Sequence, residues 1–163
     1  MVRLCFVCLG NICRSPTAEA VMRHLVKQAG LAAQIAITSA GTGDWHLGEP
    51  RDQRSQATGR ARGIPLSGVA RQFTAASFAG CDYVLAMDAA NRKALLAMAP
   101  DDEARAKIAL LRAFEPGAPD DHAAAADVPD PYYGGPGGFE HVFDICQAAC
   151  AGLLTQIRRE HGI

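Results

Sequence analysis

A cysteine and an arginine that together could bind and attack a phosphate group stand near the start of the chain. Residues 8–15 read Cys-Leu-Gly-Asn-Ile-Cys-Arg-Ser, so that five residues separate Cys8 from Arg14. Arginine carries a planar, permanently charged fork that matches two phosphate oxygens. A neighbouring cation and a helix N-terminus favour the nucleophilic thiolate form of a cysteine. We therefore expect residues 8–15, here called the phosphate loop, to bind an anion above the sulfur of Cys8, to which the Ser15 hydroxyl could donate a hydrogen bond.

The segments on either side of the phosphate loop predict a strand before it and a helix after it. Residues 2–7 form an apolar, β-prone run, whereas Ser15-Pro16 is typical of a helix start, with Ser15 as the N-cap and Pro16 in the first helical position. A helix N-terminus offers unpaired N–H groups and the positive end of the helix dipole. Gly10 and Asn11 both tolerate a positive φ, which would let the loop turn its N–H groups inward around phosphate oxygens.

The rest of the chain alternates predicted strands with predicted helices. Further strands are predicted at 35–38, 83–87 and 108–111, and helices at 16–29, 51–62, 89–98 and 139–159. This alternation predicts a three-layer, doubly wound α/β fold, in which a four-stranded parallel sheet of flavodoxin-like order has helices on both faces. The phosphate loop would then lie at the carboxyl edge of the sheet, near the switch point where such folds bind ligands.

A Pro- and Gly-rich run from residue 116 to 138 is too long for a simple connection, and loops of this length are usually functional. Within it, Asp130 lies between two prolines that restrict its backbone. A departing oxygen needs a proton, which a carboxylic acid can deliver and later take back from water. Asp130 is our candidate for this acid; the alternative is that it only begins a turn.

Three aromatic residues, Trp45, Tyr132 and Tyr133, are candidates for the walls of a substrate pocket. A phenyl ring that enters between aromatic faces buries area and gains edge or stacking contacts. A deep slot of this kind would keep the shorter phosphoserine from reaching the sulfur. The alternative for Trp45 is a place in the core, but its flanking residues are typical of a loop.

Several further motifs follow the phosphate loop in a fixed order. They are Ser39-Ala40-Gly41-Thr42, Val69-Ala70-Arg71-Gln72, Met87-Asp88 and Asp130-Pro131-Tyr132-Tyr133. In this order and at this spacing the chain resembles the low-molecular-weight protein tyrosine phosphatase family over nearly its whole length. The resemblance implies one phosphatase domain, residues 1–163, which hydrolyses phosphotyrosine proteins or aryl phosphates through a phosphocysteine intermediate.

The resemblance also implies roles for individual residues. Cys8 is the nucleophile, Arg14 and the loop amides bind the phosphate, and Asp130 is the general acid and base. The phosphate-binding residues are then Leu9, Gly10, Asn11, Ile12, Cys13, Arg14 and Ser15. Asn11, Ser15 and Ser39 support the loop by side-chain hydrogen bonds. Many relatives add a histidine just before Val-Ala-Arg-Gln, where this chain has Gly68, so that this support must be weaker, come from water or be provided elsewhere.

Composition and charge indicate an ordinary globular domain. The chain has 163 residues, of which 49% are hydrophobic and 20% charged, with a net charge of −1. With this net charge, no overall electrostatic field favours binding to nucleic acid or to an anionic membrane. No apolar stretch approaches the roughly 20 residues that span a bilayer. Without the pattern of an export signal, we expect a cytoplasmic monomer with no cofactor, which binds phosphate, vanadate or sulfate as anions.

The six cysteines are expected to be reduced rather than paired in disulfides. Cys5 and Cys8 have the spacing of a zinc site, but no second pair of ligands follows, so that no metal is expected. Cys13 could capture an oxidised Cys8 as a disulfide and so spare it from irreversible oxidation. The alternative is that Cys13 only packs beneath the loop.

A group of arginines, Arg51, Arg54, Arg60 and Arg62, is expected to be the solvated face of a helix; the alternative is a partner-binding patch. Two other functions are less consistent with the sequence. An arsenate reductase of the same fold would need a second cysteine after Cys81, and residues 82–95 contain none. A non-catalytic phosphotyrosine-binding module would not need Cys8, Arg14 and Asp130 together.

Overall fold

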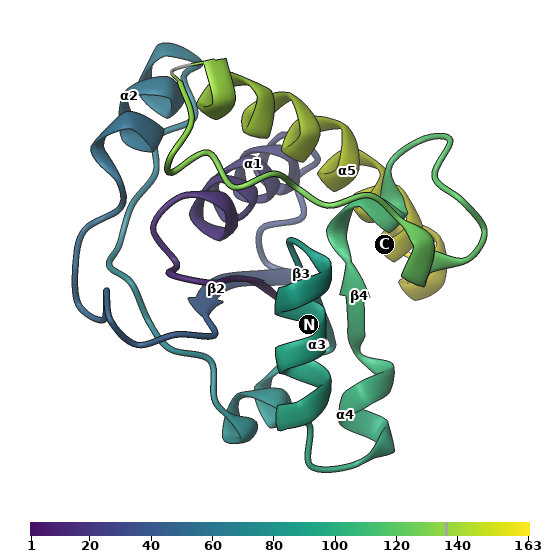
Figure 1. Ribbon diagram of the computed structural model, residues 1–163. Coiled ribbons are helices and arrows are strands. Elements are labelled where there is room, and N and C mark those ends of the chain that lie inside the picture. The colour runs from purple at the N-terminus through teal and green to yellow at the C-terminus, as the bar shows by residue number, and fades with distance from the viewer. Residues whose placement is uncertain (136) are drawn as a thin grey trace.

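Four short strands form a wholly parallel sheet at the centre of the computed structural model, which describes residues 1–135 and 137–163 (Figure 1). The strands are β1 (Val2–Cys8), β2 (Ile35–Gly41), β3 (Tyr83–Ala86) and β4 (Ile108–Leu110). Their order is β2-β1-β3-β4, so that the chain reverses direction across the sheet after β2. The predicted doubly wound α/β fold is confirmed, and the carboxyl ends of β1 and β3 meet at the switch point.

Helices cover both faces of this sheet, with α1 and α5 together on one face and α3 on the other (Figure 1). The α-helices are α1 (Arg14–Gln28), α2 (Gln53–Ala61), α3 (Ala89–Met98), α4 (Asp102–Ala106) and α5 (Gly137–His161). Three short 3₁₀ segments, η1 (Ala75–Gly80), η2 (Leu111–Phe114) and η3 (His122–Ala124), complete the elements. The helix α4, which begins after the N-cap Asp101, was not predicted because it has too few residues for a periodic pattern.

The start of α1 differs from the prediction. The helix begins at Arg14, and its N-cap is Cys13, which makes no side-chain capping hydrogen bond. Ser15 is therefore inside the first turn, and Pro16 is not the first helical residue. The Ser15 hydroxyl is turned toward Cys8 instead, at 3.0 Å from the sulfur, and so is not available as a cap.

The second helix also begins later than predicted, at Gln53, because Asp52 caps it by accepting hydrogen bonds from the N–H groups of Arg54 and Ser55. Arg51 consequently lies before the helix. An N-cap has non-helical backbone angles, so the chain changes direction there and residues that precede it do not share the helix surface.

The core is built on β1, which is apolar on both faces as a central strand of a parallel sheet must be. Leu4, Phe6 and Val7 are almost completely buried in it. On the face that carries α1, α5 packs tightly against η2 at Gly152, where an added Cβ would lie 1.8 Å from the carbonyl oxygen of Phe114. Because α1 packs against α5, this close approach helps to hold the helical layer in place.

The long run from residue 116 to 138 crosses the carboxyl edge of the sheet; Pro136, which belongs to it, is outside the described residues. Two hydrogen bonds fasten the run to the end of β3: Val128 N–H donates to the Met87 carbonyl at 2.7 Å, and Ala89 N–H donates to the Asp127 carboxylate at 2.9 Å. These bonds bring the Asp130 segment next to the phosphate loop. No helix within the described ranges combines the length and apolar character that crossing a bilayer requires.

Candidate active site

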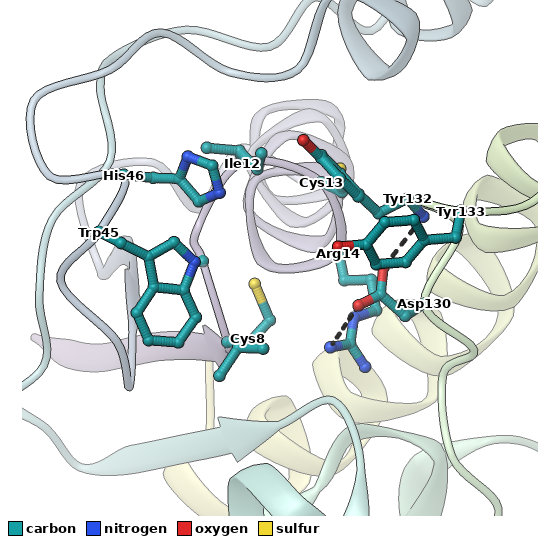
Figure 2. A pocket seen from close by; sticks show the side chains of 11 residues that line it. Cys8, Ile12, Cys13, Arg14, Trp45, His46, Asp130, Tyr132 and Tyr133 are labelled. Atoms are coloured by element: carbon teal, nitrogen blue, oxygen red, sulfur yellow. Dashed lines mark hydrogen bonds and ion pairs between the residues drawn. The ribbon is translucent and has the colours of Figure 1, made fainter.

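The sulfur of Cys8 lies at the bottom of a pocket formed at the carboxyl end of β1, and it points into the open space (Figure 2). Cys8 is only 3% exposed. Its sulfur accepts a hydrogen bond from the Asn11 N–H at 3.3 Å and lies 3.0 Å from the Ser15 hydroxyl. Hydrogen-bond donors aimed at the sulfur stabilise negative charge on it. The loop thus holds the side chain that the sequence proposed as the nucleophile.

The turn of the phosphate loop is made by Asn11, whose φ of 57° is positive, unlike that of any other non-glycine residue in the described ranges. Its side chain is fully used: the amide donates to Ser15 Oγ at 2.8 Å and to Ser39 Oγ at 2.9 Å, and the oxygen accepts from the Arg71 N–H at 2.9 Å. The motifs around Ser39 and Arg71 therefore meet at one buried asparagine.

Gly10, which also tolerates a positive φ, does not have one. A Cβ at Gly10 would lie 2.9 Å from the His46 ring. The glycine is therefore suited to the close approach of the His46 side chain rather than to the turn itself.

Arg14 is buried at the first turn of α1 and bound on three sides. Its Nη1 donates to Asp88 at 2.6 Å and to the Val128 carbonyl at 3.1 Å, while Nη2 lies 3.6 Å from the Asp130 carboxylate. Burial by itself would lower the pKa of Arg14, but the negative charges of Cys8, Asp88 and Asp130 outweigh it and raise the pKa above its usual value. The guanidinium is therefore a fixed cation beside the sulfur.

Asp130 lies on the pocket wall opposite Trp45 (Figure 2). Its side chain is 46% exposed, and its Oδ1 accepts a hydrogen bond from the Tyr132 N–H at 3.0 Å. This bond and the neighbouring Arg14 fix the orientation of the carboxyl group toward the pocket. The Asp88 carboxylate, by contrast, holds Arg14 from behind and caps α3 by accepting from the Asn91 N–H.

The pocket has a volume of about 280 Å³. Cys8, Leu9, Gly10, Ile12, Cys13, Arg14, Trp45, His46, Asp130, Tyr132 and Tyr133 line it. Trp45 is 60% and Tyr133 93% exposed, so that both are at the rim, and the Tyr132 and Tyr133 rings meet edge to face at 4.9 Å. An aromatic slot above a cationic, hydrogen-bonding base suits a flat group that carries a phosphate.

His46 was not predicted at the pocket, although it directly follows Trp45 in the sequence. It approaches Gly10, and its Nδ1 lies 2.7 Å from the Glu49 carboxylate. A lone histidine without metal-ligand spacing gives no sequence signal, and its position next to Trp45 was the one available indication.

The expectation that Arg51 belongs to a solvated helix face is wrong. Arg51 is 4% exposed and donates from Nη1 to both the carbonyl and the side-chain oxygen of Asn11, at 2.7 and 2.8 Å. Its position before the N-cap of α2 allows this inward turn. Gly68 lies against this guanidinium.

The other three arginines of that group lie at the surface or near it. Arg54 stacks over Tyr132, with its Cζ 5.3 Å from the ring centre, Arg60 is exposed, and Arg62 pairs with Glu140 at 2.6 Å.

All six cysteines are free thiols, and Cys13 lies beside the pocket. Burial, with a further contribution from the Asp52 charge, raises the pKa of Cys13 to about 12. Cys81 lies elsewhere: with Cys5 it lines a separate cavity. Within the part of the chain that the structure describes, no group of three or more His, Cys, Asp or Glu side chains is placed to hold a metal ion.

Comparison with known proteins identifies a family for this chain. The family model described as low molecular weight phosphotyrosine protein phosphatase matches residues 3–162. A low molecular weight protein-tyrosine-phosphatase of Streptomyces coelicolor is 46% identical over 158 residues, which cover 97% of this chain and 94% of the relative.

Solved structures give the same result. A protein tyrosine phosphatase of Entamoeba histolytica with Hepes in its active site superposes with a TM-score of 0.90 at 38% identity, covering 99% of each chain. A Drosophila arginine phosphatase superposes with a TM-score of 0.85 at 32% identity, covering 97% of this chain and 98% of that chain.

The phosphate loop should bind tetrahedral anions, and Arg14 should be needed for it. A ligand that binds the native state raises the melting temperature, so vanadate or phosphate should stabilise the parent protein. Arg14→Lys removes the two-pronged contact and should weaken anion binding at least about tenfold, or about 1.4 kcal/mol. Thermal melts with increasing vanadate measure this, and Arg60→Lys on the exposed face of α2 is the control. Equal stabilisation of both variants would contradict the assignment.

Proposed function

The chain belongs to the low molecular weight phosphotyrosine protein phosphatase family, and we propose that it hydrolyses phosphotyrosine through a phosphocysteine formed on Cys8. One observation carries the proposal: the Cys8 sulfur points into the pocket, with the Asn11 N–H and the Ser15 hydroxyl directed at it and Arg14 beside it. A thiol that merely filled the core would not need donors on its sulfur. The activity of the family, the hydrolysis of protein phosphotyrosine, is the reaction to which this arrangement is suited.

In the first step the Cys8 thiolate attacks phosphorus in line with the ester bond. The sulfur–phosphorus bond forms as the phosphorus–oxygen bond to the tyrosine ring breaks, and Asp130 gives its proton to the departing phenolate oxygen. The three equatorial oxygens carry the charge of the transition state, which the Arg14 fork and the loop amides stabilise. Asp130 starts this step protonated and ends it as a carboxylate.

In the second step water attacks the phosphocysteine. The Asp130 carboxylate takes a proton from this water, the new phosphorus–oxygen bond forms, and the sulfur–phosphorus bond breaks. Cys8 leaves as a thiolate and inorganic phosphate as the product. The Ser15 hydroxyl, 3.0 Å from the sulfur, is placed to stabilise the thiolate as it forms again.

The walls of the pocket favour an aryl ester over other phosphate monoesters. A ring between Trp45 and Tyr132 would contact apolar and aromatic surface, and Ile12 adds to that surface near the sulfur. The Drosophila neighbour is named an arginine phosphatase, but phosphoarginine would carry a polar guanidinium that the Ile12 side chain cannot hydrogen-bond. We therefore place phosphotyrosine first. An arsenate reductase relay has no support, because Cys81 lines a cavity other than that of Cys8.

We further propose that the protein works in a reducing compartment such as the cytoplasm, and six free thiols are consistent with this location. When an oxidant is present, we propose that Cys8 and Cys13 form a disulfide. Hydrogen peroxide would oxidise the Cys8 thiolate to a sulfenic acid with release of hydroxide. The Cys13 sulfur would then attack the sulfenic sulfur, forming the disulfide and releasing water.

Replacing Cys8 by serine should abolish turnover while leaving anion binding largely intact. A serine hydroxyl is a far weaker nucleophile without a base beside it. Hydrolysis of phosphotyrosine, phosphoserine and phosphoarginine peptides by parent and Cys8→Ser, with vanadate melts as the folding control, measures this. Turnover by Cys8→Ser would refute the mechanism, and a preference of the parent for phosphoarginine would refute the substrate.

Asp130→Asn should remove the proton donor without disturbing the fold, because the side chain is almost half exposed. General acid catalysis contributes about 10²–10⁴-fold, so we expect kcat to fall within that range for a tyrosine ester. A general acid makes activity fall on the basic side of the pH profile, so this decline should be present in the parent and absent from the variant. Asp120→Asn, at an exposed position of the same loop that does not line the pocket, is the control. A parallel basic-side decline in Asp130→Asn would exclude Asp130 as the donor.

Cys13 should protect Cys8 increasingly as the pH rises. Its pKa of about 12 means that the reactive thiolate fraction of Cys13 grows about tenfold for each pH unit in the range 7 to 9. Activity is measured after peroxide and then reductant, for parent, Cys13→Ser and the control Cys81→Ser, whose side chain lines a separate cavity. Unchanged recovery in Cys13→Ser at every pH would leave Cys13 with a packing role alone.

A further inference from the structure

Arg51 places a buried guanidinium against the side of the phosphate loop that faces away from the pocket. Its Nη1 contacts both oxygens of Asn11, at 2.7 and 2.8 Å. Its Nε donates to the Ser67 carbonyl at 3.0 Å, and its Nη2 lies 3.4 Å from Ser39 Oγ. Arg51 is not among the residues that line the pocket, so that it can act on a bound anion only through the loop.

Both contacts of Arg51 Nη1 are to Asn11, the residue that makes the strained turn of the loop. A non-glycine residue with a positive φ persists only where its surroundings fix it. The Asn11 N–H is directed at the Cys8 sulfur, while its carbonyl is held by Arg51. The second contact, to Asn11 Oδ1, fixes the side chain that also bonds Ser15 and Ser39. One guanidinium therefore sets both the backbone and the side chain of Asn11.

The charge of Arg51 is only partly neutralised. The carboxylate paired with it, Glu19, lies 3.6 Å from Nη2 and is shared with Arg23 at 2.9 Å and with the Ser39 hydroxyl. Burial, together with the positive charge of Arg71, lowers the pKa of Arg51, and the negative charges of Glu19 and Cys8 offset this only in part. A guanidinium remains charged at neutral pH in any protein, so that Arg51 adds a second fixed cation near the sulfur, behind the loop.

Gly68 provides the room that this arrangement needs. Its φ is 81°, and a Cβ there would stand 3.4 Å from Arg51 Nη2. A larger side chain would meet the guanidinium where it bonds Ser39 and Asn11. The missing side chain at position 68 thus leaves space for the arginine that supports Asn11.

We propose that Arg51 is a positioning residue of the phosphatase reaction, which holds Asn11 in the anion-binding conformation and stabilises the Cys8 thiolate through its charge. The proposal rests on the proposed function, since it assumes that Cys8 reacts as a thiolate. Arg51 itself touches neither substrate nor reacting atoms.

The test compares Arg51→Met, which removes the charge and the donors, with Arg51→Lys, which keeps the charge but not the fork. Arg60→Met removes an equal charge from the exposed face of α2 and is the control. For each variant we would measure kcat and KM for an aryl phosphate, the pH dependence of Cys8 alkylation by iodoacetamide followed by mass spectrometry, and a thermal melt.

We expect Arg51→Met to lower kcat/KM at least about tenfold and to move half-maximal alkylation of Cys8 about one pH unit higher, because both the loop shape and the charge are lost. Arg51→Lys should leave the alkylation profile near that of the parent but still lower kcat at least about threefold, because a single ammonium cannot hold both oxygens of Asn11. A purely structural role would lower the melting temperature without separating these two readouts.

Three results would overturn the proposal. The first is that the kinetic constants and the alkylation profile of Arg51→Met are within twofold of those of Arg60→Met. The second is that Arg51→Met has normal turnover per folded molecule and only a lower melting temperature. The third is that neither Arg51 variant folds. The last two would make Arg51 a residue of stability alone. If the parent hydrolysed no aryl phosphate, the proposed function would fail instead, and the alkylation profiles would still decide whether Arg51 affects Cys8.

Discussion

The site depends on one constraint, the left-handed backbone of Asn11. This turn directs the Asn11 N–H at the Cys8 sulfur and bends the phosphate loop back to the start of α1. Such a conformation is unfavourable for a residue with a side chain and must be fixed by its neighbours. Asn11 is buried and bonded through its backbone N–H, its carbonyl and both ends of its side chain to five groups, two of them in the phosphate loop itself and three in other segments. They are Ser15, Ser39, Arg51, the Arg71 N–H and the Cys8 sulfur.

A second set of contacts links the part of the site that holds the proposed nucleophile to the loop that carries the proposed acid. Arg14 is bound by Asp88 at the end of β3 and by the Val128 carbonyl of the long loop, and it lies near Asp130. The strand end, the loop and the helix start thereby share one guanidinium. The position of the proposed acid relative to the proposed nucleophile thus follows from how the sheet ends at its switch point, since β1 and β3 are neighbours there.

Much of the fold could be predicted because it depends on local patterns. Apolar runs gave the four strands, and residues 89–98 were predicted as a helix with the same bounds that α3 has. The start of α1 was misplaced because Ser15 has the chemistry of an N-cap, while its hydroxyl is used by the Cys8 sulfur. Local propensity cannot register such a competing partner, which the fold supplies.

The sequence by itself determined the chemistry that is available: a cysteine, an arginine and an aspartate flanked by aromatic residues, on a doubly wound sheet. It could do so because residue type and short spacing fix what a loop before a helix can bind. Only the tertiary structure decided that Arg51 turns inward beneath Asn11, that Gly10 makes room for His46, and that Trp45 stands at the rim. These facts depend on contacts between segments far apart in the chain, and the direction of a side chain across such a distance is set by packing rather than by its neighbours in sequence.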